Sequence, residues 1–381
     1  MEIIGSGTYG CVYYPGFNCN GKINKTKMVT KISNDEIGVK SESEIGKIIK
    51  ESVKNYKNFF VIVEKKCNIK RSNIDNYVKK TCDLVKEEKR TEYYLLYSNY
   101  TNGYDLKDYY LTDLKIPNNI KNYYNNFFIY TKNLLEGINI LKNINIVHFD
   151  ISFKNIRIES LSNKALLIDF GLSLNLNKII KKKDLYGNIK EIDINEVITS
   201  FSINPITSPK YCFEIQIICY IVINNLINMR FKEENLLNIV ENYYKKNTLF
   251  TLFSDSFKNE YITNIIKIHK DLINLNGIDV IKKCLNTWDS WDNFNLNYHF
   301  LVILYNLEYY HPLILNLIKL FMNQIHPNYN NRYSIDNLLE NFNDILEDKK
   351  SIKSILELKT SIQKMNYQKV GNSFEKSLKY L

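Results

Sequence analysis

The sequence predicts an α+β fold, with a small β-rich amino-terminal lobe followed by a larger, mainly helical carboxy-terminal lobe. Apolar, aromatic and β-branched runs of strand length occupy residues 59–63 and 93–97. From residue 123 to residue 142, apolar side chains instead recur at helical spacing. The spacing of apolar residues thus changes between these segments, which predicts strands in the first part of the chain and helices after it.

The order of these segments also predicts where the domains lie. We expect the small lobe at residues 1–98 and the large lobe at residues 99–350 of the 381. Within the large lobe, residues 215–288 are largely helical in pattern. Residues 351–381 are expected to form a helical extension.

The first predicted element is a hairpin, because the chain opens with the pattern G-x-G-x-x-G-x-V. Glycines let a backbone approach phosphates closely, and the exposed N–H groups of such a turn attract anions. A dinucleotide fold would need a helix directly after the glycines, whereas residues 11–15 resemble a second strand. A β-hairpin over the phosphates of a nucleotide is therefore favoured. Its residues are Ile4, Gly5, Ser6, Gly7, Thr8, Tyr9, Gly10, Cys11 and Val12.

The next strand, residues 28–32, carries Lys31 among apolar neighbours. In a lysine-rich chain the residue type alone means little, but a strand lysine behind a glycine hairpin is placed to grip the α- and β-phosphates. The following helix offers an ion-pair partner. Glu44 is preferred because it stands just ahead of apolar positions at helical spacing, and Glu42 is the alternative. Either carboxylate would also suit a solvated helix start.

Three further side chains suit phosphoryl transfer. That reaction needs one carboxylate to orient the acceptor hydroxyl and oxygen ligands to hold Mg²⁺ on the phosphates. Asp150 suits the first role, whereas Asn155 and Asp169 suit the second. A His-x-Asp alone would equally fit a polar turn between strands. The Asn five residues later and the following Asp-Phe-Gly make that alternative much weaker.

Together these motifs resemble those of the eukaryotic-type protein kinases. The set, with its Asn-, Lys- and Ile-rich composition, is similar to serine/threonine protein kinases encoded by large DNA viruses. The resemblance implies a bilobal protein-kinase-like fold with ATP and Mg²⁺ as cofactors. It also implies a protein substrate whose hydroxyl group, on Ser or Thr, accepts the γ-phosphate of ATP.

The resemblance extends to weaker positions. Residues 98–106 resemble the hinge that meets adenine, with Asp105 reaching the ribose. Glu214 matches the glutamate that closes the activation segment, and Arg332 its usual partner, so a buried ion pair is expected. Asp292 is expected to brace the catalytic loop. Because residues 215–288 make this part of the chain longer than in typical kinases, the resemblance implies that they are an insertion.

Several positions depart from the family pattern. Phe149 replaces the arginine that normally receives an activation-loop phosphate, so switching by phosphorylation of that loop is not expected. Ser152 stands where serine/threonine kinases usually carry lysine. Lys154, a second catalytic candidate, lies where tyrosine kinases often carry a basic residue. Ser/Thr and Tyr acceptors therefore both stay open. Cys212 and Phe213 replace the usual residues before Glu214.

Composition sets further limits. The net charge is +10, but the lysines are spread along the chain, so no stable nucleic-acid complex is expected. The seven cysteines form no C-x-x-C pair and are interpreted as free thiols in a reducing compartment, with no structural zinc. No apolar run reaches the roughly 18 residues of a membrane span. Because the glycine pattern begins at residue 5, no signal peptide is expected. A soluble, intracellular protein is expected, in the host cytoplasm or virion if viral.

Three functions remain open at this point. The first is an active protein kinase. The second is a nucleotide-binding pseudokinase that acts as a scaffold, although Lys31, Asp150, Asn155 and Asp169 are all present. The third is a small-molecule kinase of the aminoglycoside or choline class, which shares a His-x-Asp but lacks the Asp-Phe-Gly. Oligomeric state is not indicated by the residues.

Overall fold

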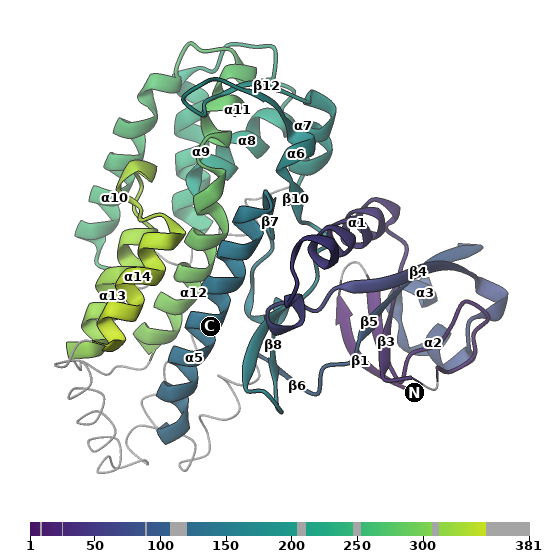
Figure 1. The fold of residues 1–381 in the computed structure, drawn as a ribbon. Helices are drawn as coiled ribbons and strands as arrows, with labels where there is room; N and C mark the ends of the chain where they lie inside the picture. Colours follow the sequence, from purple (N-terminus) through teal and green to yellow (C-terminus); the bar gives the residue numbers. More distant parts are fainter. Residues whose placement is uncertain are drawn as a thin grey trace. The chain divides into compact units, whose positions relative to one another are not determined.

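A computed structural model describes residues 1–7, 10–24, 26–87, 90–106, 120–203, 211–246, 253–306 and 312–347. These residues form a mixed α+β structure (Figure 1). They divide into two compact units. Unit 1 comprises Met1–Leu106 and Lys154–Ser173, and unit 2 comprises Lys107–Phe153 and Leu174–Leu381. The domain boundaries expected from the sequence stay predictions, and the extension expected at 351–381 lies outside the described residues.

Unit 1 is built on a five-stranded antiparallel sheet with the strand order β1-β2-β3-β5-β4. The strand expected at residues 93–97 is confirmed as part of β5. The strands are β1 Glu2–Gly7, β2 Gly10–Tyr14, β3 Met28–Ser33, β4 Val63–Lys70 and β5 Glu92–Asn99.

β5 carries buried side chains on both faces of the sheet, since alternate residues of a strand point in opposite directions. Tyr93, Leu95 and Tyr97 belong to the larger core cluster, which the short helices α2 (Asn76–Thr81) and α3 (Asp83–Glu87) also enter. Leu96 lies in a second cluster with Val39 of the helix α1 (Glu36–Ser52). Asp35 caps α1, since its carboxylate accepts a hydrogen bond from Gly38 N at 3.1 Å. The sheet therefore fixes the position of α1.

The strand expected at residues 59–63 is wrong, although the run is apolar and Phe60 is buried. Only Val63 enters β4. The preceding residues pair instead with the end of β9 (Lys164–Leu167): Val61 N donates to Leu167 O at 3.0 Å, and Leu167 N donates to Phe59 O at 2.8 Å. The run is buried because it attaches a second sheet of unit 1, and its apolar character does not by itself make it a strand.

That second sheet has three antiparallel strands in the order β6-β8-β9. β6 spans Gly103–Asp105 and β8 spans Ile156–Glu159. The short turn η5 (Phe153–Asn155) precedes β8, and Asp169 follows β9 after one residue. Both metal-ligand candidates therefore lie at the same end of this β8–β9 hairpin.

The prediction that all cysteines are free thiols is wrong. Cys11 is bonded to Cys82, with their Cα atoms 5.9 Å apart, and Cys19 is bonded to Cys67, with Cα atoms 6.2 Å apart. The partners are 71 and 48 residues apart in the sequence and meet only because the sheet of unit 1 brings them together. Cysteine spacing therefore gives no support for a reducing compartment. The free cysteines among the described residues are Cys212, Cys219 and Cys284, all buried.

Unit 2 is mainly helical. The helix expected at residues 123–142 is confirmed as α5 (Ile120–Asn143), which packs with α12 and α14 (Figure 1). Residues 215–246 and 253–288 are largely helical, as expected. None of the described helices has the length and apolar character needed to cross a membrane. The other helices are α6 Leu176–Ile179, α7 Ile194–Phe201, α8 Phe213–Ile223, α9 Glu233–Lys246, α10 Asp255–His269, α11 Gly277–Leu285, α12 Trp291–Asn306, α13 Pro312–Gln324 and α14 Ile335–Glu347.

Two short antiparallel pairs complete unit 2. β7 (Ile146–Val147) pairs with β10 (Leu174–Asn175) and leads directly into the segment that carries Asp150. β11 (Ile180–Lys183) and β12 (Ile189–Ile192) form a hairpin that follows α6. The first pair fixes the start of the candidate catalytic loop against the segment that follows Ser173.

Candidate active site

The glycine-rich segment forms the hairpin that the sequence predicts, with Ser6 opposite Cys11 and Gly7 opposite Gly10. A strand, not a helix, follows the glycines. At Gly10 an added Cβ would lie 2.3 Å from Ile32 O of β3, so only glycine lets β2 approach its neighbour this closely. Thr8 and Tyr9, at the tip, lie outside the described residues.

Lys31 lies on β3 opposite Val12 of the glycine hairpin. Its ammonium group contacts two carboxylates of unit 1. Lys31 Nζ lies 3.0 Å from Glu42 Oε2 and 2.7 Å from Asp169 Oδ1. Residues 138 positions apart in the sequence thus share one ion-pair network, which joins the strand lysine to the Asp-Phe-Gly segment.

The preferred partner of Lys31, Glu44, is corrected to the alternative, Glu42. The phase of α1 explains why. Glu42 shares the buried face of the helix with Ile45 and Ile49, at the spacing of three and seven residues that brings side chains onto one face. Glu44 is two positions further on and therefore roughly 200° around the helix. Glu44 stands next to apolar residues in the sequence, but this position does not place it on the buried face of the helix.

The electrostatics of this network keep Lys31 charged. Burial disfavours the ammonium ion, but Glu42 and Asp169 outweigh that effect and raise the pKa of Lys31 above its usual value. Burial also raises the pKa of the Glu42 carboxyl, although Lys31 opposes this shift. The side chain of Asp169 is 43% exposed, compared with 10% for Glu42. Asp169 is therefore the solvent-facing member of the network.

Asp169 and Asn155 are held close together by the backbone. Ile168 N, one residue before Asp169, donates to Asn155 O at 3.0 Å. Asp169 has a left-handed φ of 63°, and the neighbouring ring of Phe170 is buried edge-on against Phe60 at 5.9 Å between centroids. A carboxylate and a side-chain amide oxygen are hard donors of the kind that Mg²⁺ prefers. These two side chains therefore suit a magnesium site in unit 1.

Asp105, the expected ribose ligand, lies on β6 opposite Arg157 of β8. It is half-buried. Arg157 itself donates to the carbonyl oxygens of Thr101 and Gly103, which holds the chain that leads into β6. The structure thus places Asp105 in unit 1, and its role toward a ribose stays a prediction.

In unit 2, the candidate catalytic loop is held by Asp292, as the sequence predicts. The carboxylate of Asp292 accepts hydrogen bonds from His148 N at 2.6 Å and from Phe149 N at 2.9 Å. His299 Nε2 also lies 3.2 Å from Ile151 O. The backbone on both sides of Asp150 is therefore fixed by α12, the helix that carries Asp292 and His299.

Phe149 has a left-handed φ of 67°, a conformation that costs a bulky residue about 1 to 2 kcal/mol. Buried aromatic contacts hold it there. The Phe149 ring stacks on Tyr211 at 5.0 Å and lies edge-on to Phe201 at 5.6 Å, with Trp291 at 6.4 Å. Phe201 and Tyr211 come from the segment between β12 and α8. Apolar packing thus joins the loop to that segment at the position where the kinases that the sequence resembles carry an arginine.

Asp150 is half-buried and belongs to unit 2, whereas Lys154, Asn155, Asp169 and Lys31 belong to unit 1. Lys154 is exposed on η5. The network around Lys31 therefore belongs to unit 1, and the loop around Asp150 belongs to unit 2.

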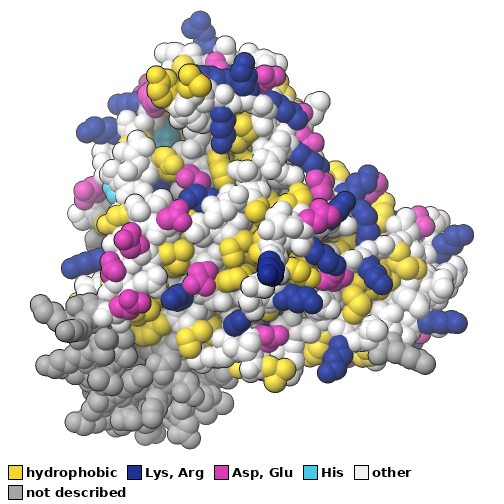
Figure 2. All heavy atoms as spheres, viewed as in Figure 1, with side chains coloured by type: hydrophobic (Ala, Val, Ile, Leu, Met, Phe, Trp, Pro, Cys, Tyr) yellow, Lys and Arg dark blue, Asp and Glu magenta, His cyan; other side chains and the backbone are white. Residues whose placement is uncertain are grey.

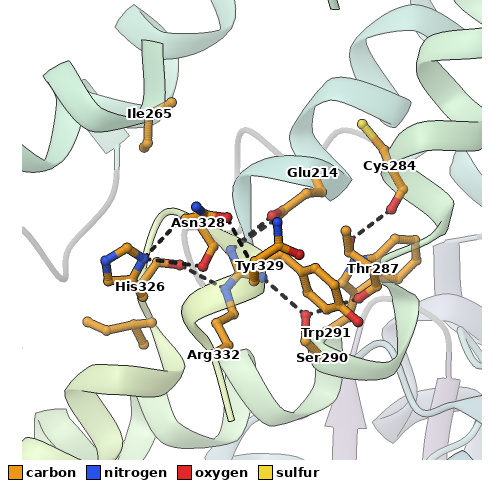
Figure 3. A network of polar contacts seen from close by, with 12 residues as sticks. Glu214, Ile265, Cys284, Thr287, Ser290, Trp291, His326, Asn328, Tyr329 and Arg332 are labelled. Carbon is orange, nitrogen blue, oxygen red and sulfur yellow. Dashed lines mark hydrogen bonds and ion pairs between the residues drawn. The ribbon is translucent and has the colours of Figure 1, made fainter. Parts of the chain in front are cut away.

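The expected ion pair between Glu214 and Arg332 is confirmed within unit 2 (Figure 3). Arg332 Nη2 lies 3.0 and 3.3 Å from the two carboxylate oxygens of Glu214. Arg332 also donates to His326 O at 2.8 Å and to Ser290 Oγ at 3.1 Å. Although burial disfavours its ionised form, Arg332 and His269 hold the pKa of Glu214 below its ordinary value. Ser208, before this helix, lies outside the described residues.

Sequence reasoning missed the link from Asp169 to Lys31 and the support from His299. A strand lysine, the glutamates at the start of the next helix and an Asp-Phe-Gly are visible in the sequence, so the first link had a signal in their combination. His299 had none, since one histidine in an apolar helix more often fills a core than supports a loop.

Comparison with known proteins gives distant kinase relatives, and no protein-family model matches the chain. A moss protein, mitogen-activated protein kinase kinase kinase 1b of Physcomitrium patens, is 26% identical over 187 residues, covering 49% of this chain and 20% of the relative. Mitogen-activated protein kinase kinase kinase nsy-1 of Caenorhabditis elegans is 26% identical over 170 residues, covering 44% and 10%. The probable serine/threonine-protein kinase fnkB of Dictyostelium discoideum is 32% identical over 108 residues, covering 28% and 18%.

The chain thus spans a fifth or less of the length of these relatives. All three are named as protein kinases, and two of them match nearly half of the chain. The sequence therefore has a distant kinase-like relationship, which agrees with the motifs placed above.

Proposed function

We propose that this chain is a protein kinase that transfers the γ-phosphate of ATP to hydroxyl groups of proteins, with Ser or Thr as acceptor. The observation that carries the proposal is the network in unit 1 where Lys31 joins Glu42 and Asp169. A half-buried lysine whose ammonium group lies between a helix carboxylate and the carboxylate of an Asp-Phe-Gly segment is suited to bind phosphates.

In this proposal unit 1 binds the nucleotide. The glycine hairpin covers the phosphates with backbone N–H groups, Lys31 grips the α- and β-phosphates, and Asp105 reaches the ribose. Glu42 keeps the ammonium of Lys31 oriented. Asn155 and Asp169 would hold Mg²⁺, which neutralises charge on the phosphates when bound.

Asp150 acts on the acceptor. Its carboxylate accepts a hydrogen bond from the substrate hydroxyl and takes the proton as the oxygen attacks the γ-phosphorus. The new O–P bond forms as the bond from phosphorus to the β,γ-bridging oxygen breaks, and ADP leaves. Two hydrogen bonds to Asp292 and the aromatic contacts of Phe149 hold the backbone of the loop just before Asp150.

The choice of Ser or Thr as acceptor rests on the motif set and on the distant relative fnkB, which is named as a probable serine/threonine kinase. Lys154 is proposed to assist at the acceptor. The kinship with kinases of large DNA viruses is likewise proposed from the motifs and composition alone.

Transfer of labelled γ-phosphate from Mg-ATP tests the proposal against its alternatives. Casein or histone should be labelled by the wild type and not by Asp150→Ala or Lys31→Met. Equal labelling by the wild type and Asp150→Ala would remove Asp150 from the mechanism. Labelling of aminoalcohols but of no protein would favour a small-molecule kinase. Mg-ATP binding without any transfer would favour a pseudokinase.

A further inference from the structure

The hairpin β11–β12 is rigidly attached to unit 2, although its outer surface is exposed. Ile189 and Ile192 are buried beneath it, and Ile189 N donates to Asn286 Oδ1 at 2.9 Å. Lys181, Lys182 and Lys183 are exposed. The hairpin is thus a fixed element that presents consecutive lysines, and it plays no part in the site described above.

Two adjoining hollows lie beside this hairpin, with volumes of about 410 and 260 Å³. They share Asn145 and Lys183, and together we call them the hairpin hollow. The larger part is also lined by Lys142, Asn143, Gly187, Ile189, Asn286, Trp288 and Asp289. The smaller part is also lined by Leu176, Asn177, Ile180, Lys181 and Lys182. Figure 2 shows Lys and Arg side chains over the part of the surface that Figure 1 labels β12.

The charges of the hairpin hollow favour an anion. Four lysines line it against a single carboxylate, that of Asp289. Two of the lysines are already neutralised: Lys142 pairs with Asp336 at 2.9 Å, and Lys181 pairs with Asp193 at 3.3 Å. The remaining two lining lysines, Lys182 and Lys183 of β11, are not neutralised in this way.

Those two lysines are Lys182 and Lys183. Neither forms an ion pair with a carboxylate of the described residues, although Glu191 stands opposite Lys182 in the hairpin register. Lys183 Nζ lies over the ring of Trp288, 6.0 Å from its centroid. Two neighbouring cations beside a hollow, one held over an aromatic ring, form an attractive site for negative charge.

The neutral lining favours a peptide over a nucleic acid. Asparagine amides line both parts of the hollow, and each amide can donate and accept hydrogen bonds. A peptide backbone offers both donors and acceptors, whereas a phosphodiester backbone offers acceptors only. The combined volume is also far larger than a single phosphate needs. A short segment with acidic side chains fits these features best.

The hollow also lies near the candidate catalytic loop in the same unit. Asn145 is five residues before Asp150, so their Cα atoms are at most about 18 Å apart. Asn145 is fixed, because Leu176 N donates to its carbonyl oxygen at 2.9 Å. A segment bound here can therefore belong to the same peptide as an acceptor hydroxyl at Asp150.

We propose that the hairpin hollow binds an acidic segment of the protein substrate, next to the residue that is phosphorylated. The inference rests on the proposed kinase function and adds a substrate class to it. Substrates with Asp or Glu clusters a few residues from the acceptor are selected through Lys182 and Lys183.

Binding is measured first, without ATP, by fluorescence anisotropy of a labelled peptide with a run of Glu residues beside one Ser. Lys182→Glu/Lys183→Glu should weaken binding about tenfold or more, whereas Lys267→Glu/Lys270→Glu, a matched pair of exposed lysines on unit 2, should leave it within about twofold. The milder Lys182→Gln/Lys183→Gln variant should lie between them. Peptide binding should also change the fluorescence of Trp288, and Trp288→Phe should remove that change.

Catalysis provides the second readout. For the acidic peptide, Lys182→Glu/Lys183→Glu should raise KM about tenfold with kcat unchanged, and for a peptide without the Glu run neither value should change. Unaltered affinity in that variant would overturn the proposal, as would equally tight binding of single-stranded DNA with the same charge. Asp150→Ala should still bind the peptide. A wild type that binds the acidic peptide but transfers no phosphate would count against the kinase function and not against the hollow.

Discussion

Breaking the ion pair between Glu214 and Arg332 should strongly destabilise unit 2. Their side chains are only 4% and 1% exposed, so removal of either charge leaves the other buried without its partner. For Arg332→Leu we expect a loss of about 3 to 5 kcal/mol in the free energy of unfolding, the usual cost of an uncompensated buried charge. The variant also loses the bonds to His326 O and Ser290 Oγ, which places it toward the upper end of that range.

The double variant Glu214→Leu/Arg332→Leu distinguishes the interaction energy of the ion pair from the contributions that each residue makes through its other contacts. Since neither charge remains buried, its cost should be smaller than the sum of the two single costs by about 2 to 3 kcal/mol. Urea unfolding followed by circular dichroism and tryptophan fluorescence measures this, because Trp291 lies near the pair in Figure 3. Glu241→Gln, which breaks the exposed pair with Lys245, is the control and should change nothing measurable. Strict additivity, or a loss below about 1 kcal/mol for Arg332→Leu, would refute the reasoning.

Three further results are expected. In steady-state kinetics, Glu42→Gln should lower kcat/KM for ATP by about tenfold or more, because Glu42 is the partner of Lys31, whereas Glu44→Gln should leave kcat/KM nearly unchanged. A larger loss of kcat/KM in Glu44→Gln than in Glu42→Gln would restore Glu44 as the partner of Lys31. Cys11→Ser/Cys82→Ser should lower the free energy of unfolding of unit 1, measured by urea denaturation, by about 4 kcal/mol, because the disulfide no longer closes the 71-residue loop. An unchanged urea midpoint would show that the disulfide is absent in solution. Because the folded-state pKa of Glu214 is lowered, its contribution to the free energy of unfolding is present above its unfolded pKa and is lost as the pH falls through its folded pKa. Between about pH 6 and pH 3, the free energy of unfolding should therefore decrease less steeply for Glu214→Gln than for the wild type. An equal decrease in both proteins would contradict this.

Features fixed by the order of motifs along the chain could be predicted from the sequence. The pair of Glu214 with Arg332 and the support of the loop by Asp292 both involve residues more than a hundred positions from their partners. They were accessible because each residue has a recognisable local motif. The glycine hairpin was accessible for a different reason: the residues after the glycines favour a strand.

Features that depend on helix phase or on long-range packing could not be predicted. Glu42 and Glu44 are two positions apart on one helix, and only the sheet against which α1 packs decides which of them faces Lys31. The sequence gives no local pattern that identifies the disulfide partners, because the paired cysteines are 71 and 48 residues apart and come together only in the folded unit. The apolar run at 59–63 joins β9 through isolated hydrogen bonds, which a strand pattern does not distinguish from a sheet strand.

The most direct test of the account is a comparison of Asp150→Asn with the wild type in two measurements on the same preparations: the Kd for Mg-ATP and kcat for a protein acceptor. Asp150 is proposed to act on the acceptor alone, so Asp150→Asn should bind Mg-ATP with unchanged affinity and lose about 100-fold or more in kcat. Asp279→Asn, a half-exposed aspartate on unit 2, is the matched control and should retain both values. Full turnover by Asp150→Asn would contradict the proposed mechanism.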